Sequence, residues 1–183
     1  MSRTEIRITG YGGQGVILCG YIIGRAAAIH ANKHATQIQS FGPEARGSAC
    51  STTLVICDTE VLYPYIKEPD FFVAMSSEGY EKYRHELKKD GKLIYGSDLV
   101  KPVEEDVKRA YGVPATTIAE RIGRSLVQNI VMLGFVTAVI NLVSKEQMRE
   151  AVKGSVPPGT EELNLKAFEA GWAAFEEQYG AGA

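Results

Sequence analysis

Short apolar runs, separated by stretches of helical character, predict alternating strands and helices in the first half of the chain. The runs have strand length and are rich in β-branched and aromatic residues. Strands are expected at residues 6–9, 34–39, 49–57, 71–75, 92–95 and 113–116. Helices are expected at residues 16–30 and 77–89, and Asp90 and Gly91 end the second one.

The pattern turns helical in the C-terminal third. Helices are expected at residues 125–142, 144–152 and 160–178, with breaks at Gly154 and at the Pro157-Pro158 pair. Ser144 and Gln147 have the spacing of a capping box. Thr160 is a candidate helix cap, and the two acids that follow it suit a helix N-terminus.

The apolar stretch at residues 130–140 is shorter than the roughly 20 residues that a bilayer span needs. It lies in a longer segment that also carries Gln128, Asn129 and Asn141. A helix that is apolar on all sides is a buried helix. Either its own domain or a neighbouring subunit would cover it, and the sequence leaves both readings open.

Strands that alternate with helices favour parallel pairing, because parallel neighbours need crossover connections. The 183 residues also fit one domain, since domains commonly have about 100–200 residues. We therefore expect a single-domain, Rossmann-like three-layer α/β sandwich with a mostly parallel sheet, spanning residues 1–183.

Composition narrows the class of partner. The chain is 45% hydrophobic and 23% charged, as ordinary globular domains are, and its net charge of -2 argues against a nucleic-acid partner. The three cysteines lack the spacing of an iron–sulfur motif or a disulfide framework. With no secretory signal and no membrane span in the sequence, a cytoplasmic location is expected.

A glycine motif follows the first expected strand. Gly10, Gly12 and Gly15 fit G-x-G-x-x-G, in which glycines let the backbone approach a pyrophosphate at a helix N-terminus. Residues 30–40 contain no acid to hold a ribose, which disfavours NAD; for NADP, only Lys33 or His34 would offer a basic group. The motif lacks Gly-Lys-Ser/Thr, so it is not a phosphate loop of the Walker type. A tight turn that merely packs against a neighbour is the competing interpretation.

A second loop, at residues 40–48, follows another expected strand and is placed beside the first at the carboxyl edge of the sheet. Arg46 offers a planar fork of donors that suits phosphate or carboxylate, and Glu44 could hold that fork or pair with another chain. A plain surface ion pair is the alternative. Neither a metal-ligand set nor a hydrolase triad is found in the sequence.

With both loops, the chain closely resembles the gamma subunits of 2-oxoacid:ferredoxin oxidoreductases. The resemblance covers nearly the whole chain. Its segments are Gly-Tyr-Gly-Gly-Gln-Gly (10–15), Phe-Gly-Pro-Glu-Ala-Arg-Gly (41–47), Pro-Asp-Phe-Phe-Val-Ala (69–74), Asn-Ile-Val-Met-Leu-Gly (129–134) and Asn-Leu-Lys-Ala-Phe-Glu-Ala-Gly (164–171). Many relatives have two glycines after the arginine, whereas this chain has Gly47 and then Ser48.

The resemblance implies a complex that decarboxylates a 2-oxoacid, 2-oxoglutarate as first choice, to an acyl-CoA with electrons passing to ferredoxin. Thiamine diphosphate and iron–sulfur clusters would lie on alpha and beta subunits and a ferredoxin-like delta subunit, because this chain has no motif for them. This chain would contribute to assembly and to binding coenzyme A. The cofactor-binding residues implied are Gly12, Gly13, Gln14, Gly15, Glu44, Arg46 and Gly47, and no catalytic or metal-binding residue is implied.

Three alternatives stay open. The chain resembles the small subunit of an indolepyruvate:ferredoxin oxidoreductase in its glycine opening. A stand-alone NAD(P)-binding enzyme would need a ribose-reading acid and a proton donor, neither of which is evident in the sequence. A purely structural assembly subunit would bind no coenzyme A in any setting.

Overall fold

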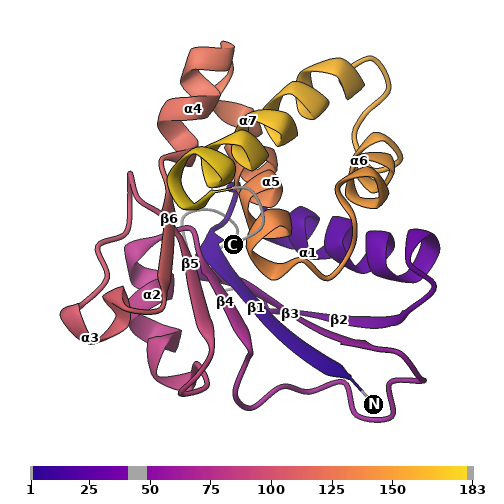
Figure 1. The fold of residues 1–183 in the computed structure, drawn as a ribbon, viewed down its shortest axis with the longest axis vertical. Coiled ribbons are helices and arrows are strands. Elements are labelled where there is room, and N and C mark those ends of the chain that lie inside the picture. Colours follow the sequence, from indigo (N-terminus) through magenta and orange to yellow (C-terminus); the bar gives the residue numbers. More distant parts are fainter. Residues whose placement is uncertain (1, 41–48, 181–183) are drawn as a thin grey trace.

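A computed structural model describes residues 2–40 and 49–180. Within them, six strands form one sheet in the order β2-β3-β1-β4-β5-β6 (Figure 1). The strands are β1 (Arg3–Tyr11), β2 (His34–Ser40), β3 (Ala49–Cys57), β4 (Phe71–Ala74), β5 (Lys92–Gly96) and β6 (Ala110–Val113).

The sheet is mostly parallel, as the sequence predicts. β1, β4, β5 and β6 pair in parallel in that order. β3 is antiparallel to both of its neighbours, β1 and β2, so β2 runs in the same direction as β1. Among the described residues, only β3 is reversed. The carboxyl end of β2 therefore lies at the same sheet edge as that of β1.

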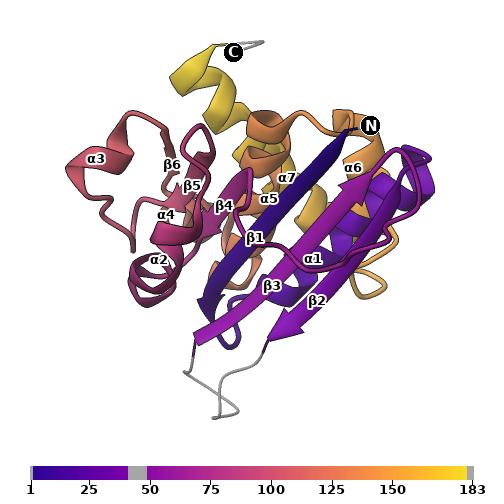
Figure 2. The ribbon, with the colours of Figure 1, turned by 90° about the horizontal axis from the view of Figure 1, so that it is seen from below.

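Helices cover the two faces of the sheet unequally. They are α1 (Val16–Arg25), α2 (Ser77–Tyr83), α3 (Glu104–Val107), α4 (Ala115–Ile122), α5 (Gln128–Ile140), α6 (Lys145–Lys153) and α7 (Glu161–Tyr179). α1, α5, α6 and α7 pack together on one face, whereas α2 lies on the other (Figures 1 and 2). This is the expected three-layer arrangement with one thick layer and one thin one.

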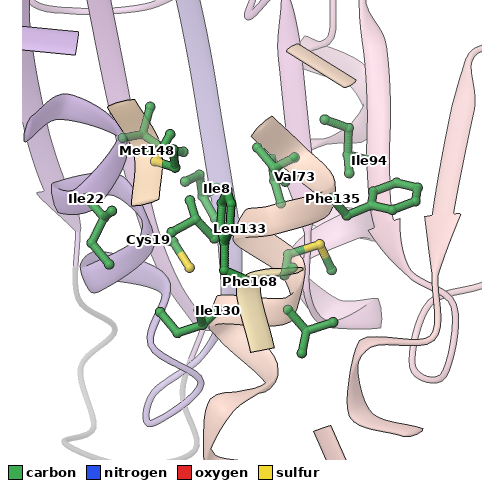
Figure 3. Packing of buried hydrophobic residues seen from close by; sticks show 14 of the residues in the cluster. Ile8, Cys19, Ile22, Val73, Ile94, Ile130, Leu133, Phe135, Met148 and Phe168 are labelled. Carbon is green, nitrogen blue, oxygen red and sulfur yellow. The ribbon is translucent and has the colours of Figure 1, made fainter. Parts of the chain in front are cut away.

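The thick layer contains the larger hydrophobic core. Ile8 of β1 points into it toward Leu133 of α5, and Phe135 of α5 lies on the side of Val73 and Ile94 (Figure 3). α5 is buried on all sides, because α4, α6 and α7 of the same chain cover the faces that the sheet does not. The apolar helix is thus covered by its own domain. Within the described residues, none of the helices combines the length and the apolarity that a membrane span requires.

Two glycines let α5 and α7 cross at backbone distance. A Cβ added to Gly134 would overlap the carbonyl oxygen of Phe168, and one added to Gly171 would overlap that of Val131. Any larger side chain would force the two helices apart. These glycines end two of the segments that carry the family resemblance, so part of that resemblance reflects packing.

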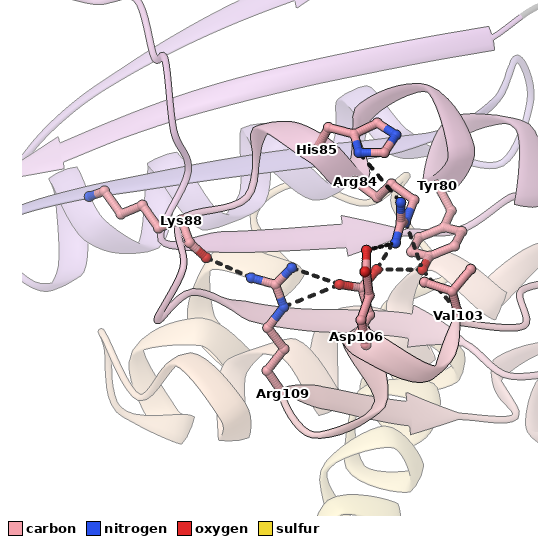
Figure 4. Close-up of polar contacts among 8 residues, drawn as sticks. Tyr80, Arg84, His85, Lys88, Val103, Asp106 and Arg109 are labelled. Carbon is pink, nitrogen blue, oxygen red and sulfur yellow. Dashed lines mark hydrogen bonds and ion pairs between the residues drawn. The ribbon is translucent and has the colours of Figure 1, made fainter.

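The thin layer has a smaller core of Phe72, Tyr80, Leu93 and neighbouring residues beneath α2. Beside it, the side chain of Asp106 is buried among hydrogen-bond donors from three directions (Figure 4). This carboxylate connects α3 to Tyr80 of α2, to Arg84 directly after α2 and to Arg109 directly before β6.

Helix boundaries agree with the sequence where a local cap defines them. Ser144 and Gln147 form the predicted capping box, with both reciprocal hydrogen bonds present. Thr160 precedes α7 as expected, but its side chain is not a cap, because its hydroxyl donates to the carbonyl of Pro157 instead. The predicted helix at 16–30 is α1 followed by a π-helical turn at Ala26–His30.

Two predicted segments were wrong in place or length. The strand expected at 113–116 is β6, which ends at Val113, and α4 begins at Ala115. Asp98, distant in sequence, accepts hydrogen bonds from the amides of Thr116 and Thr117 and so starts α4. The helix expected at 77–89 is α2 followed by a 3-10 turn, Arg84–Glu86.

Candidate functional site

The glycine turn between β1 and α1 presents bare backbone. Gly12 and Gly13 are exposed, and Gly13 has a φ of 96°, a conformation that residues with a side chain rarely adopt. No atom lies within 4 Å of the position that a Cβ on Gly13 would occupy. The turn is therefore open on this side, as the sequence predicts for a turn that a ligand or another chain approaches.

Gly15 lets α5 approach the start of α1. It is the N-cap of α1 with a φ of 74° and offers no side-chain cap. A Cβ on Gly15 would overlap the side-chain amide of Asn129. Cys19, one turn further along α1, donates from its thiol to the carbonyl of Asn129 at 3.3 Å. Burial raises the pKa of Cys19 to about 12, so this thiol is not a nucleophile at neutral pH.

Gln14 points into the protein rather than out of the turn. Its Oε1 accepts a hydrogen bond from the amide of Tyr11 at 2.7 Å, and its Nε2 donates one to the carbonyl of Met75 at 3.0 Å. The four predicted residues 12–15 thus lie together in one turn. Three of them form its accessible backbone, and Gln14 braces it from behind.

A cavity of about 270 Å³ adjoins the turn. Its walls come from the turn, from the segment before α5 and from the segment that leads into α7. They are largely apolar, with a few polar groups among them. The lining comprises Gly13, Gly15, Leu18, Arg124, Leu126, Val127, Asn129, Val156, Pro157, Thr160, Leu163 and Asn164.

Sequence reasoning missed the polar groups of this cavity. Asn129 is only 6% exposed, and its side chain has no hydrogen-bond partner among the described residues. Asn164 uses its Nδ2 on Thr160, at 2.8 Å from the carbonyl oxygen. Arg124 is exposed and makes no ion pair with any residue that the structure describes. Asn129 and Asn164 are the first residues of two segments that carry the family resemblance, and this could have marked them as candidate site residues. Arg124 lies outside those segments, so the sequence did not point to it.

The second predicted loop falls outside the described residues, so Glu44, Arg46 and Gly47 cannot be placed. The strands on either side of it are informative. Ser40 ends β2, and Ala49 begins β3 directly opposite Tyr11 of β1. Both ends of the loop are therefore at the sheet edge from which the glycine turn emerges.

The position of Lys33 argues against an NADP site. It precedes β2, at the sheet edge opposite the glycine turn, and its ammonium group pairs with Asp58 at 2.7 Å. The region from His34 to Ser40 supplies no acid for a ribose either. In the part of the chain that the structure describes, no three His, Cys, Asp or Glu side chains are grouped as metal ligands.

Together, the fold and the turn define a Rossmann-like α/β domain whose glycine turn adjoins a pocket. The profile of the pyruvate ferredoxin/flavodoxin oxidoreductase family matches residues 5–174, and the chain belongs to this family. The resemblance drawn from the two loops is thereby confirmed, as is the prediction that the chain is an oxidoreductase subunit.

Individual relatives agree with this placement. A 2-oxoglutarate synthase subunit KorC from Methanocaldococcus jannaschii is 48% identical over 96% of this chain and 95% of its own length. The crystal structure of a keto/oxoacid ferredoxin oxidoreductase gamma subunit from Geobacter sulfurreducens is 38% identical, with a TM-score of 0.86 over 97% of this chain and 98% of that one.

A third relative has the same fold within a longer chain. The 2-oxoglutarate:ferredoxin oxidoreductase of Magnetococcus marinus, solved with 2-oxoglutarate, coenzyme A and succinyl-CoA bound, matches 99% of this chain and 32% of its own, at 24% identity and a TM-score of 0.87. The fold described here thus also occurs as one part of a larger polypeptide.

Proposed function

We propose that this chain is the gamma subunit of a 2-oxoglutarate:ferredoxin oxidoreductase and that its glycine turn and adjoining cavity bind coenzyme A. The observation that carries the proposal is the exposed turn at Gly12 and Gly13, which opens on a cavity with Arg124 and Asn129 in its walls. The 48% identity to a 2-oxoglutarate synthase subunit supports the choice of 2-oxoacid.

The chemistry of the cavity fits coenzyme A. Free amides at a turn before a helix and a guanidinium group both suit phosphate oxygens. The apolar walls at Leu18, Val156 and Leu163 suit the uncharged pantetheine arm. Whole-ligand pockets commonly have roughly 300–1,000 Å³, so the cavity holds one portion of the molecule and the rest extends across the subunit surface.

The chemical steps belong to other subunits in this proposal. Thiamine diphosphate and the iron–sulfur clusters lie on alpha and beta partners and a ferredoxin-like delta partner. Bound coenzyme A supplies the thiol that accepts the acyl group. This chain holds its phosphates at the turn and fixes the direction in which the thiol end reaches the partner. We also place the complex in the cytoplasm, where free thiols such as those of Cys19, Cys50 and Cys57 persist.

The test is a coenzyme A titration of the assembled complex that compares Arg124→Ala with Arg121→Ala. Arg121 is an exposed arginine of α4 that does not line the cavity, so it controls for the loss of one positive charge. Loss of a charge-assisted hydrogen bond should raise KM for coenzyme A about tenfold or more in Arg124→Ala. Arg121→Ala should match the unmodified complex.

The outcomes separate the alternatives. Equal KM values of the two variants for coenzyme A would mean that the cavity does not bind coenzyme A. If this chain did not bind coenzyme A even within the assembled complex, the subunit would be purely structural. Comparing turnover of 2-oxoglutarate, pyruvate and indolepyruvate by the same complex tests the substrate, and a preference for indolepyruvate would favour the other subunit type. Reduction of NAD or NADP by the chain alone would contradict the whole assignment.

A further inference from the structure

The chain leaves the sheet in opposite directions after two neighbouring strands. α1 follows β1 into the thick layer, whereas α2 follows β4 into the thin layer (Figure 1). β1 and β4 are adjacent and parallel. In open parallel sheets, ligands bind beyond the carboxyl ends of strands at such a reversal. The crevice between the ends of β1 and β4 is thus where a nucleotide-like ligand would ordinarily lie.

Gln14 connects the two strand ends at this reversal. At one end its Oε1 accepts from the amide of Tyr11, the last residue of β1. At the other end its Nε2 donates to the carbonyl of Met75, the residue directly after β4. One side chain therefore connects the ends of both strands at the reversal point, and it does so with both polar atoms of its amide.

The surrounding backbone is shaped to admit this side chain. A Cβ on Gly10 would lie 2.5 Å from the Oε1 atom of Gln14, so only glycine leaves it enough room. The amide of Gln14 donates to the carbonyl of Tyr11 at 3.1 Å and closes the turn. Both the backbone and the side chain of Gln14 thus hold the turn against β1, while Gly13 and Gly15 line the cavity on the other side.

We infer that Gln14 is a positioning residue that determines on which side of the glycine turn coenzyme A binds. It occupies the space between the ends of β1 and β4 with its two hydrogen bonds, and it holds the turn so that its open backbone is presented to Asn129 and Arg124. The inference rests on the proposed function and changes the role that the sequence suggested for Gln14, from contacting the ligand to orienting the turn.

The first test compares Gln14→Ala and Gln14→Met in the assembled complex. Methionine keeps a similar side-chain length but neither hydrogen bond, whereas alanine also removes the side chain beyond Cβ. Loss of two ordinary hydrogen bonds should raise KM for coenzyme A about tenfold in both variants. kcat at saturating coenzyme A should fall by less than about twofold, since no reacting group is removed. A role in folding alone would lower the melting temperature without this separation of KM from kcat.

The second test asks whether Gln14 keeps its partners when the ligand binds. Hydrogen exchange of the segment that contains Tyr11 is measured in the complex with and without coenzyme A. The Tyr11 amide should stay protected in both states of the unmodified complex and should exchange faster in Gln14→Met. Faster exchange in the unmodified complex on adding coenzyme A would mean that Gln14 leaves Tyr11 to touch the ligand, and would overturn the inference.

Failure of this inference is distinguishable from failure of the proposed function. If Arg124→Ala raises KM for coenzyme A and the two Gln14 variants do not, the cavity binds the ligand and Gln14 does not orient the turn. If Arg124→Ala also leaves KM unchanged, the proposed coenzyme A site itself is wrong.

Discussion

Polar groups around Asp106 are hydrogen-bonded to one another, whereas several polar groups beside the glycine turn have no partner among the described residues. Asp106 accepts hydrogen bonds from Tyr80 at 2.5 Å, from Arg84 at 3.1 Å and from Arg109 at 2.6 Å (Figure 4). At the turn, by contrast, Gly12 and Gly13 expose their backbone, and the Asn129 side chain has no partner among the described residues.

The comparison suggests that the carboxyl with the perturbed pKa, Asp106, has a structural role and lies outside the site proposed for coenzyme A. Burial acts to raise the pKa of Asp106, but the hydrogen bonds from Tyr80, Arg109 and Arg84 outweigh it and leave that pKa below its usual range. Perturbed carboxylates often mark active sites, yet both oxygens of Asp106 are already used within the protein. In the site proposed for coenzyme A, by contrast, the glycine turn contributes neutral backbone, which does not titrate.

The largest expected effect is the loss of folding stability when the Asp106 hydrogen-bond network is broken. Asp106→Ala leaves Arg84 and Arg109 without their shared buried partner and should reduce the free energy of unfolding by roughly 3–5 kcal/mol. Thermal or denaturant unfolding measures this loss, with Glu104→Ala, an exposed neighbour on α3, as the control. Coenzyme A affinity of the complex should not change while the protein is folded. An Asp106→Ala variant with an unchanged free energy of unfolding would mean that the network does not stabilise the fold.

Gly13→Val tests the turn. Valine is strained at a φ of 96° and covers the open backbone, so KM for coenzyme A should rise at least about tenfold, with a stability loss of about 1–2 kcal/mol. Gly180→Val is the matched control, because Gly180 also has a positive φ, 85°, and open space around it, at the end of α7. Similar stability losses with a KM change only in Gly13→Val are expected. Equal KM changes would contradict a binding role.

The pH dependence of the free energy of unfolding tests whether Asp106 is ionised in the folded chain. Because the pKa of Asp106 is lower in the folded chain, its stabilisation is present above the unfolded pKa of about 3.9 and is lost as pH falls through the folded value. The stability difference between the unmodified chain and Asp106→Asn should therefore shrink below about pH 4. Hydrogen bonds from Lys33 and Ser2 lower the pKa of the exposed Asp58 to about 2, but solvent screens this surface pair, so Asp58→Asn should have a much smaller effect than Asp106→Asn at every pH. A constant difference would argue against the assigned ionisation.

The smallest effect concerns the thiol beneath the turn. Cys19 is buried with a pKa of about 12, so alkylation at pH 8 should be far slower than at the partly exposed Cys57. Intact-mass measurements on two double variants, Cys50→Ser with Cys57→Ser and Cys50→Ser with Cys19→Ser, leave one thiol each and report the two rates separately. Reaction of Cys19 as fast as Cys57 would show that α1 and α5 separate readily next to the turn.

Local signals in the sequence were sufficient where neighbouring residues make the structure. β3 has the predicted bounds, Ala49–Cys57, because its β-branched composition sets it apart from the flanking segments. The capping box at Ser144 was likewise predictable from four consecutive residues. Prediction was wrong where a distant group decides, as at α4, whose start depends on Asp98.

The sequence by itself determined the alternation of strands and helices and the bare glycine turn, since composition and short-range spacing specify both. The tertiary structure decided which groups face that turn. Asn129 and Arg124 reach the cavity only because α5 packs against α1, and Gln14 turns inward only because Met75 follows the neighbouring strand. Contacts of this kind join residues that are far apart along the chain, and no local pattern of residue types encodes them.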